Sequence, residues 1–66
     1  MLLKRMVIDM KRPDYDFILA NGTEEGESYG MGIYRLDGWY YVLAYGRVLG
    51  DFSSFELAAD YIYLMR

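Results

Sequence analysis

Two carboxylates, Asp14 and Asp16, have the residue type and spacing that could best support acid–base chemistry in this sequence. Glycoside hydrolases, for example, use a pair of carboxylates. However, the 66 residues include no histidine and no cysteine, which supply the usual general base and thiol nucleophile. Asp14 and Asp16 also alternate with Tyr15 and Phe17, as on the solvent face of a strand. We therefore predict no catalytic residues and a protein that is not an enzyme.

Binding of a metal or cofactor is also not expected. Glu24, Glu25 and Glu27 offer oxygen ligands for calcium, but they lack the spacing of an EF-hand loop and are typical of a solvated loop. The glycines between positions 22 and 32 resemble a phosphate-binding loop only in composition, and the surrounding acids would repel phosphate. A chain this short should also lack a pocket of the usual ~300 Å³ or more. We expect no metal and no cofactor.

Composition indicates one small folded domain spanning residues 1–66. Apolar residues make up 55% of the chain and aromatic residues 18%, which argues against disorder. No apolar run approaches the roughly 20 residues of a membrane-spanning helix. The first 12 residues, MLLKRMVIDMKR, have basic residues within the apolar stretch and no cleavage site typical of a signal peptide. We predict a soluble, cytoplasmic protein with no membrane partner.

Charge is unevenly distributed along the chain. Residues 1–12 carry a net charge of +3, whereas residues 13–37 carry −5. An acidic middle disfavours nucleic-acid binding, which usually requires a basic face, and instead suits contact with a basic protein surface. We predict that this contact uses five carboxylates, namely Asp14, Asp16, Glu24, Glu25 and Glu27.

The C-terminal residues predict an amphipathic helix over Ser53–Met65. Ser53 and Glu56 have the S-x-x-E spacing of a capping box, with Phe52 and Leu57 placed as a hydrophobic staple. The apolar residues that follow recur at helical spacing. They are Leu57, Ala58, Tyr61, Ile62, Leu64 and Met65.

A strand meander is predicted before this helix. Asp37-Gly38 and Tyr45-Gly46 have the character of two-residue hairpin turns. The first turn predicts the pairs Leu36–Trp39, Tyr34–Tyr41 and Gly32–Leu43. The second predicts Leu43–Val48, Tyr41–Gly50 and Trp39–Phe52. One face is then nearly all apolar and should receive the helix. It holds Tyr34, Leu36, Trp39, Tyr41, Leu43, Val48 and Phe52.

The opposite face is also rich in apolar residues, and a large exposed apolar patch usually marks a contact site. Ile33, Val42 and Leu49 form its centre, and we predict that they make a self-interface. The candidates to cover this face are the N-terminal segment, a second copy of the chain or a foreign partner. Tyr40, Arg35 and Arg47 are predicted to anchor a second partner-binding surface, since tyrosine and arginine are enriched at interface hot spots.

The N-terminal third supports two readings. Alternation of Tyr15, Phe17 and Leu19 with acids favours a strand, followed by a loop over residues 21–28. In the alternative, Pro13 starts a short helix that ends at Asn21-Gly22. Residues 2–10 fit either a strand or a helix. The predicted fold class is α+β: an antiparallel meander of four or five strands with one C-terminal α-helix packed on one face.

Two resemblances bear on function. The stretch from Gly46 to Ala58 resembles the last strand and helix start of three-stranded DNA-binding domains of the integrase-arm and plant AP2 type. That likeness implies a sheet that reads DNA with basic side chains, but Arg35 and Arg47 are too few for the usual number of phosphate contacts.

In size and charge the whole chain resembles the small acidic inhibitors that phages and mobile elements direct against host defence, such as anti-CRISPR and anti-restriction proteins. That resemblance implies a protein partner, for example a host nucleic-acid-processing complex. We expect such an inhibitor first, a homodimeric interaction protein as the alternative, and a small DNA-binding domain third.

Overall fold

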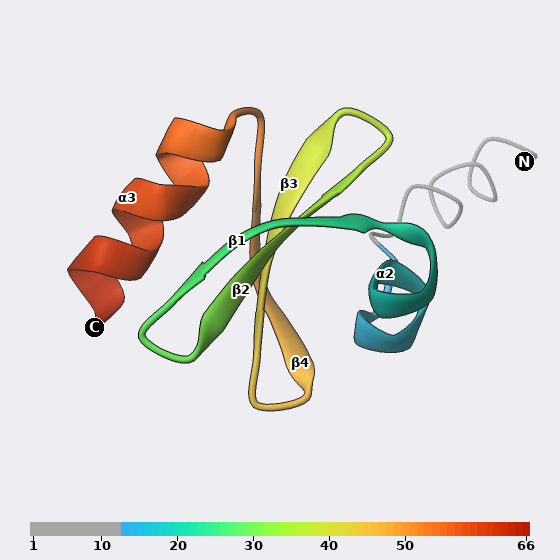
Figure 1. The fold of residues 1–66 in the computed structure, drawn as a ribbon, viewed down its shortest axis with the longest axis horizontal. Coiled ribbons are helices and arrows are strands. Elements are labelled where there is room, and N and C mark those ends of the chain that lie inside the picture. The colour runs from blue at the N-terminus through green and yellow to red at the C-terminus, as the bar shows by residue number, and fades with distance from the viewer. Residues whose placement is uncertain (1–12) are drawn as a thin grey trace, which may run out of the picture.

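The computed structural model describes residues 13–66, so the form of residues 2–10 lies outside the described part of the chain. Its elements are α2 (Tyr15–Asn21), β1 (Thr23–Ser28), β2 (Met31–Leu36), β3 (Trp39–Ala44), β4 (Arg47–Phe52) and α3 (Phe55–Met65). The strands form one antiparallel sheet in the order β1-β2-β3-β4 (Figure 1). The α+β class and the meander are confirmed, with four strands, and with a second helix that was not in the predicted fold.

Each hairpin closes through a two-residue turn with left-handed backbone. Asp37 and Gly38 have φ values of 52° and 83°, and Tyr45 and Gly46 have 55° and 71°, so both predicted turns are confirmed. A third turn, Tyr29-Gly30, has the same form with φ values of 52° and 77°. The sequence analysis missed it because residues 21–28 were expected to form a loop, so no strand was expected before Tyr29 for a hairpin turn to join.

A β-bulge alters the register between β3 and β4. The three predicted β2–β3 pairs and the Leu43–Val48 pair are confirmed. Beyond that point Val42 pairs with Gly50 and Tyr40 with Phe52, so the predicted Tyr41–Gly50 and Trp39–Phe52 pairs are wrong. Leu49 is the extra residue, and one extra residue moves every later side chain of the strand to the other face.

This bulge changes which face α3 covers. Phe52 lies on the same face as Tyr40, and the chain continues from Phe52 into α3 on that side. Ala58 and Ile62 of α3 pack against Met31, Ile33, Val42 and Ala44. The prediction that the helix would cover the face of Tyr41 and Leu43 is therefore wrong.

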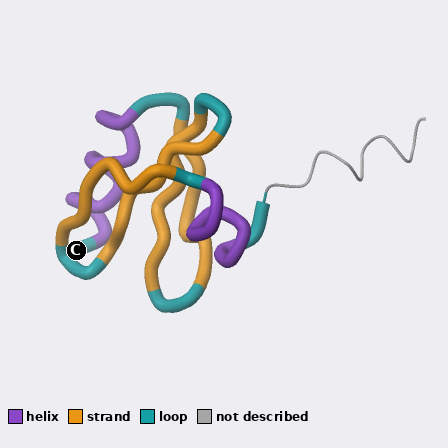
Figure 2. Tube along the Cα trace, turned by 45° about the vertical axis from the view of Figure 1, so that its right-hand side comes forward, coloured by secondary structure: helices purple, strands orange, loops and turns teal. Residues whose placement is uncertain are grey.

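The face of Tyr41 and Leu43 instead packs against α2. Ile18 is fully buried there, and half-buried residues surround it, namely Tyr15, Tyr34, Leu36 and Val48. Figures 1 and 2 show α2 and α3 on opposite sides of the sheet, which is therefore the middle of three layers. The strand predicted for residues 14–19 is wrong. The alternative short helix is correct in type and in its end at Asn21-Gly22, but the helix begins at Tyr15, not at Pro13.

Local hydrogen bonds explain why this segment is helical. Asp14 is the N-cap, and its Oδ1 accepts a 3.0 Å hydrogen bond from the Phe17 backbone N–H. At the other end, the Gly22 N–H donates to the Ile18 carbonyl oxygen over 2.8 Å. A Cβ at Gly22 would lie only 2.9 Å from that oxygen, so a larger residue would not fit here without a shift. Helical spacing then directs Tyr15 and Ile18 toward the sheet.

Two further boundaries differ from the sequence prediction. Ser54, not Ser53, caps α3, and its Oγ accepts a 3.2 Å hydrogen bond from the Leu57 N–H. Leu57 is consequently at the third helical position, where its side chain is half exposed, and it does not form the predicted staple. Residues 23–28 form the edge strand β1, so the predicted loop over residues 21–28 is also wrong.

Candidate functional site

Acidic side chains gather on the side of the sheet that α2 covers. Glu24 pairs with Tyr34 and Glu27 with Gly32, and this register places both carboxylates on that side. The α2 segment adds its own acids, and Asp51 lies opposite Tyr41. We call this surface the acidic side. Its members are Asp14, Asp16, Glu24, Glu27, Asp37 and Asp51.

The arginines of the described chain lie elsewhere. Arg35 is paired with Tyr40 and Arg47 with Ala44, which places both on the α3 side. Arg66, at the end of α3, has its guanidinium carbon 4.1 Å from the Tyr63 ring centroid and 5.6 Å from that of Tyr29. Within residues 13–66, therefore, the acidic side contains no positive charge and should attract cationic groups.

Glu25 is the predicted partner-binding acid that does not belong to this surface. The β1–β2 register shifts between Glu24 and Gly26, so Glu25 is the bulged residue. Its Oε2 accepts a 2.9 Å hydrogen bond from Arg35 Nε. This hydrogen bond, and secondarily the Glu25 charge, raises the pKa of Arg35. Glu25 and Arg35 were assigned to different surfaces by the sequence, but they pair and largely cancel each other's charge.

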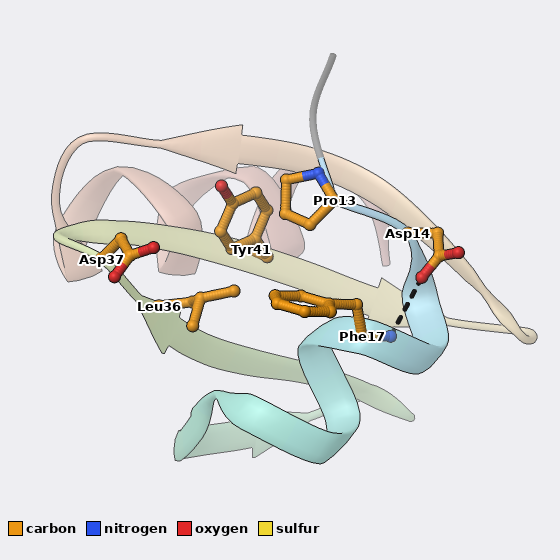
Figure 3. Close-up of a pocket in the computed structure, with 6 residues that line it drawn as sticks. All are labelled: Pro13, Asp14, Phe17, Leu36, Asp37 and Tyr41. Carbon is orange, nitrogen blue, oxygen red and sulfur yellow. Dashed lines mark hydrogen bonds between the residues drawn. The ribbon is translucent and has the colours of Figure 1, made fainter. Parts of the chain in front are cut away.

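A hollow opens on the acidic side, between α2 and the β2–β3 hairpin. Its volume is about 450 Å³, and it is wide open to solvent. The lining residues are Pro13, Asp14, Phe17, Leu36, Asp37 and Tyr41. In Figure 3 the two carboxylates stand at opposite ends, and the apolar groups lie between them. The expectation that so short a chain has no hollow of this size is wrong.

Most residues of this hollow were not found by sequence reasoning. Asp14 was predicted as a binding residue, but Phe17, Leu36 and Tyr41 were assigned to strands or to the helix-covered face. They come together because α2 is a helix that projects Phe17 beside Leu36. The alternative helix reading, which began at Pro13, was the one available signal. In the structure Asp14 is the N-cap, and Phe17 lies in the first turn of the helix.

The predicted self-interface is covered within a single chain. Ile33 is 3% exposed and Val42 is fully buried, and Leu49 packs at the edge of the same cluster beneath α3. Tyr40 is half-buried, with its ring edge-on to Phe55 at 6.3 Å between centroids. The apolar patch expected around Ile33, Val42 and Leu49 is thus part of the core. Of the predicted second surface, Arg35 and Arg47 remain exposed.

The described residues contain no group of three acidic side chains arranged to hold a metal ion. Neither helix of residues 13–66 is long and apolar enough to span a membrane.

Comparison of the chain with known protein families, curated proteins and solved structures finds no match. The arrangement itself offers a negatively charged surface with aromatic groups, which is suited to docking against a basic surface.

Proposed function

We propose that this protein acts by binding, without catalysis, and that its acidic side docks onto a basic surface of a protein partner. The observation that carries the proposal is the separation of charge by face. Glu24 and Glu27 lie on the acidic side, whereas Arg35 and Arg47 lie on the opposite side of the sheet. Opposite electrostatic potentials on two protein surfaces speed their encounter and favour the correct partner over others.

The favoured partner class is a host defence or nucleic-acid-processing complex, which the protein would inhibit. Such complexes expose basic channels that hold nucleic acid, and a compact acidic surface can occupy them. This narrower proposal is supported by the short length of the chain and its net charge of −3, because phage-encoded inhibitors of this kind are also small and acidic. Phe17 is 51% exposed and Trp39 47% exposed, and both are aromatic groups of the kind that anchor interfaces.

The test compares two variants of identical charge. Glu24→Lys with Glu27→Lys reverses charge on the acidic side, and Glu56→Lys with Asp60→Lys does so on the exposed face of α3. Each pair changes the formal net charge from −3 to +1. Purified CRISPR effector and restriction complexes are assayed for DNA cleavage with each variant at low and high salt.

We expect the wild-type chain to inhibit one of these complexes, with inhibition weakening as ionic strength rises from about 0.05 to 0.5 M. The acidic-side variant should lose this inhibition, while the α3 variant keeps it. If both variants inhibit equally well, the acidic side is not the docking surface. If none of the complexes is inhibited, the host-defence proposal fails.

A further inference from the structure

We infer that the hollow on the acidic side receives one arginine side chain of the partner. The inference rests on the proposed function, because it names the group that the basic partner would insert there. The hollow combines the two features that a guanidinium group requires, which are aromatic or apolar faces to lie against and carboxylates at its edge.

Apolar groups from separate elements form the walls. Phe17 comes from α2, Leu36 from the end of β2 and Tyr41 from β3, and Pro13 precedes α2. Tyr41 is buried, whereas half of the Phe17 side chain remains exposed to solvent. In Figure 3 the Phe17 ring and the Tyr41 side chain lie on either side of the open space. A planar group lying in the hollow would contact the exposed Phe17 ring, while the buried Tyr41 forms part of the wall.

The carboxylates at the edge retain hydrogen-bonding capacity. Asp14 uses Oδ1 to accept from the Phe17 N–H, which leaves its second oxygen for another donor. The Asp37 side chain forms no hydrogen bond or ion pair with the residues that the structure describes, and none of the described residues that line the hollow is a cation. A positive group placed here would therefore meet two negative charges.

Arginine fits this arrangement better than lysine does. A guanidinium is planar, stacks on aromatic faces and is less strongly hydrated than an ammonium group, and its donors match a carboxylate in a bidentate fashion. Lysine would gain the charge attraction but would lose the stacking and the second hydrogen bond. A neutral aliphatic side chain would gain only contact with Leu36 and the rings.

The test is a ¹H–¹⁵N NMR titration of the full chain with N-acetyl-arginine methylamide, with the lysine and norleucine analogues as comparison probes. We expect saturable shifts of the Phe17, Leu36, Asp37 and Tyr41 amides with the arginine probe. The lysine probe should bind at least about fivefold more weakly, and the norleucine probe should cause no comparable shifts.

Two variants test whether the arginine probe binds at the hollow. Asp37→Asn should weaken arginine binding at least about fivefold, because it removes one of the charge-assisted contacts. Asp60→Asn, which removes an exposed acid from α3, should leave it unchanged. Unshifted resonances elsewhere in each spectrum establish that the variant is folded. Equal binding of the arginine and lysine probes, or shifts centred away from the hollow, would overturn the inference.

The chain contains a competing source of arginine, since Arg12 immediately precedes Pro13 in the sequence. If Arg12→Gln binds the arginine probe markedly more tightly than the wild-type chain does, the chain's own arginine is the occupant and a partner's arginine is not.

The arginine site and the proposed function can fail independently of each other. Probe binding alongside inhibition that resists acidic-side charge reversal would overturn the proposed function while leaving the arginine site intact.

Discussion

Tyr34 lies directly opposite Glu24 in the β1–β2 pair and packs beside the cluster of Ile18, Tyr41 and Leu43. Burial, followed by the negative charge of Glu24, raises the pKa of Tyr34 above its usual value of 10.0. The tyrosinate form is therefore less favourable in the folded chain than in the unfolded chain. Ionisation of this side chain should favour unfolding.

The raised pKa of Tyr34 predicts how the stability of the fold depends on pH. The contribution of Tyr34 is fully present below pH 10.0 and is lost as the pH rises from 10.0 through the raised pKa. We expect Tyr34→Phe to reduce the fall in unfolding free energy between about pH 9 and pH 11, measured by urea titration. Tyr45→Phe, at a side chain that is 82% exposed, is the control. Identical pH profiles for wild type and Tyr34→Phe would contradict this prediction.

The β3–β4 turn predicts a stabilising substitution. Tyr45 has φ 55° and a largely exposed side chain, so its left-handed backbone is strained with little compensation from packing. Replacing it with asparagine should raise the unfolding free energy by about 0.5–1 kcal/mol. Gly46→Ala, at φ 71°, should lower it by about 1–2 kcal/mol. Urea midpoints at unchanged m-value check both, and a loss of stability in Tyr45→Asn would disprove the account of this turn.

The start of α3 gives a pair of matched serine variants. Ser54→Ala removes the hydroxyl that accepts from the Leu57 N–H, and it should cost about 1 kcal/mol of unfolding free energy. Ser53→Ala should have an effect within about 0.5 kcal/mol, because Ser53 is outside the cap. Thermal or urea unfolding of the two proteins distinguishes them. A larger loss for Ser53→Ala would restore the capping box expected from the sequence.

The packing of α3 on the sheet predicts that truncating Ile62 causes a large loss of unfolding free energy. Ile62 is 2% exposed against Val42 and Ala44, so Ile62→Ala should cost about 2–5 kcal/mol through lost contacts and a cavity. For a domain of this size, whose core supplies only about 3–5 kcal/mol, that loss should unfold much of the population. Leu64→Ala, at 77% exposure, should stay within about 0.5 kcal/mol. Circular dichroism at 25 °C is the readout, and equal effects would contradict the assigned helix face.

Elements set by local chemistry could be read from the sequence. Asp37-Gly38 and Tyr45-Gly46 each place glycine at a left-handed position, and the first of these turns set the β2–β3 register along the whole pair. Helical spacing likewise located α3 between residues 55 and 65. These features depend on neighbouring residues, so the periodicity and the turn residues sufficed.

The faces of the sheet were decided by tertiary packing. Both faces are apolar, so alternation alone could not say which one would receive α3. Gly50, next to Leu49, is the one residue in the sequence that indicates a bulge here. The extra residue places Phe52 on the opposite face, and the chain enters α3 from that face. The segment 14–21 likewise matched a strand by alternation. Its caps allow a helix, and the packing of Ile18 against Tyr41 and Leu43 stabilises that helix on the sheet.

The acidic side depends on both the amino-acid composition and the tertiary structure. The sequence shows an excess of carboxylates between residues 13 and 37, because charge is a property of composition. Only the folded chain separates Glu24 and Glu27 from Arg35, pairs Arg35 with Glu25, and brings Phe17 and Asp37 to the same hollow. Those relations depend on strand register and helix placement, which are set by contacts between residues distant in the chain.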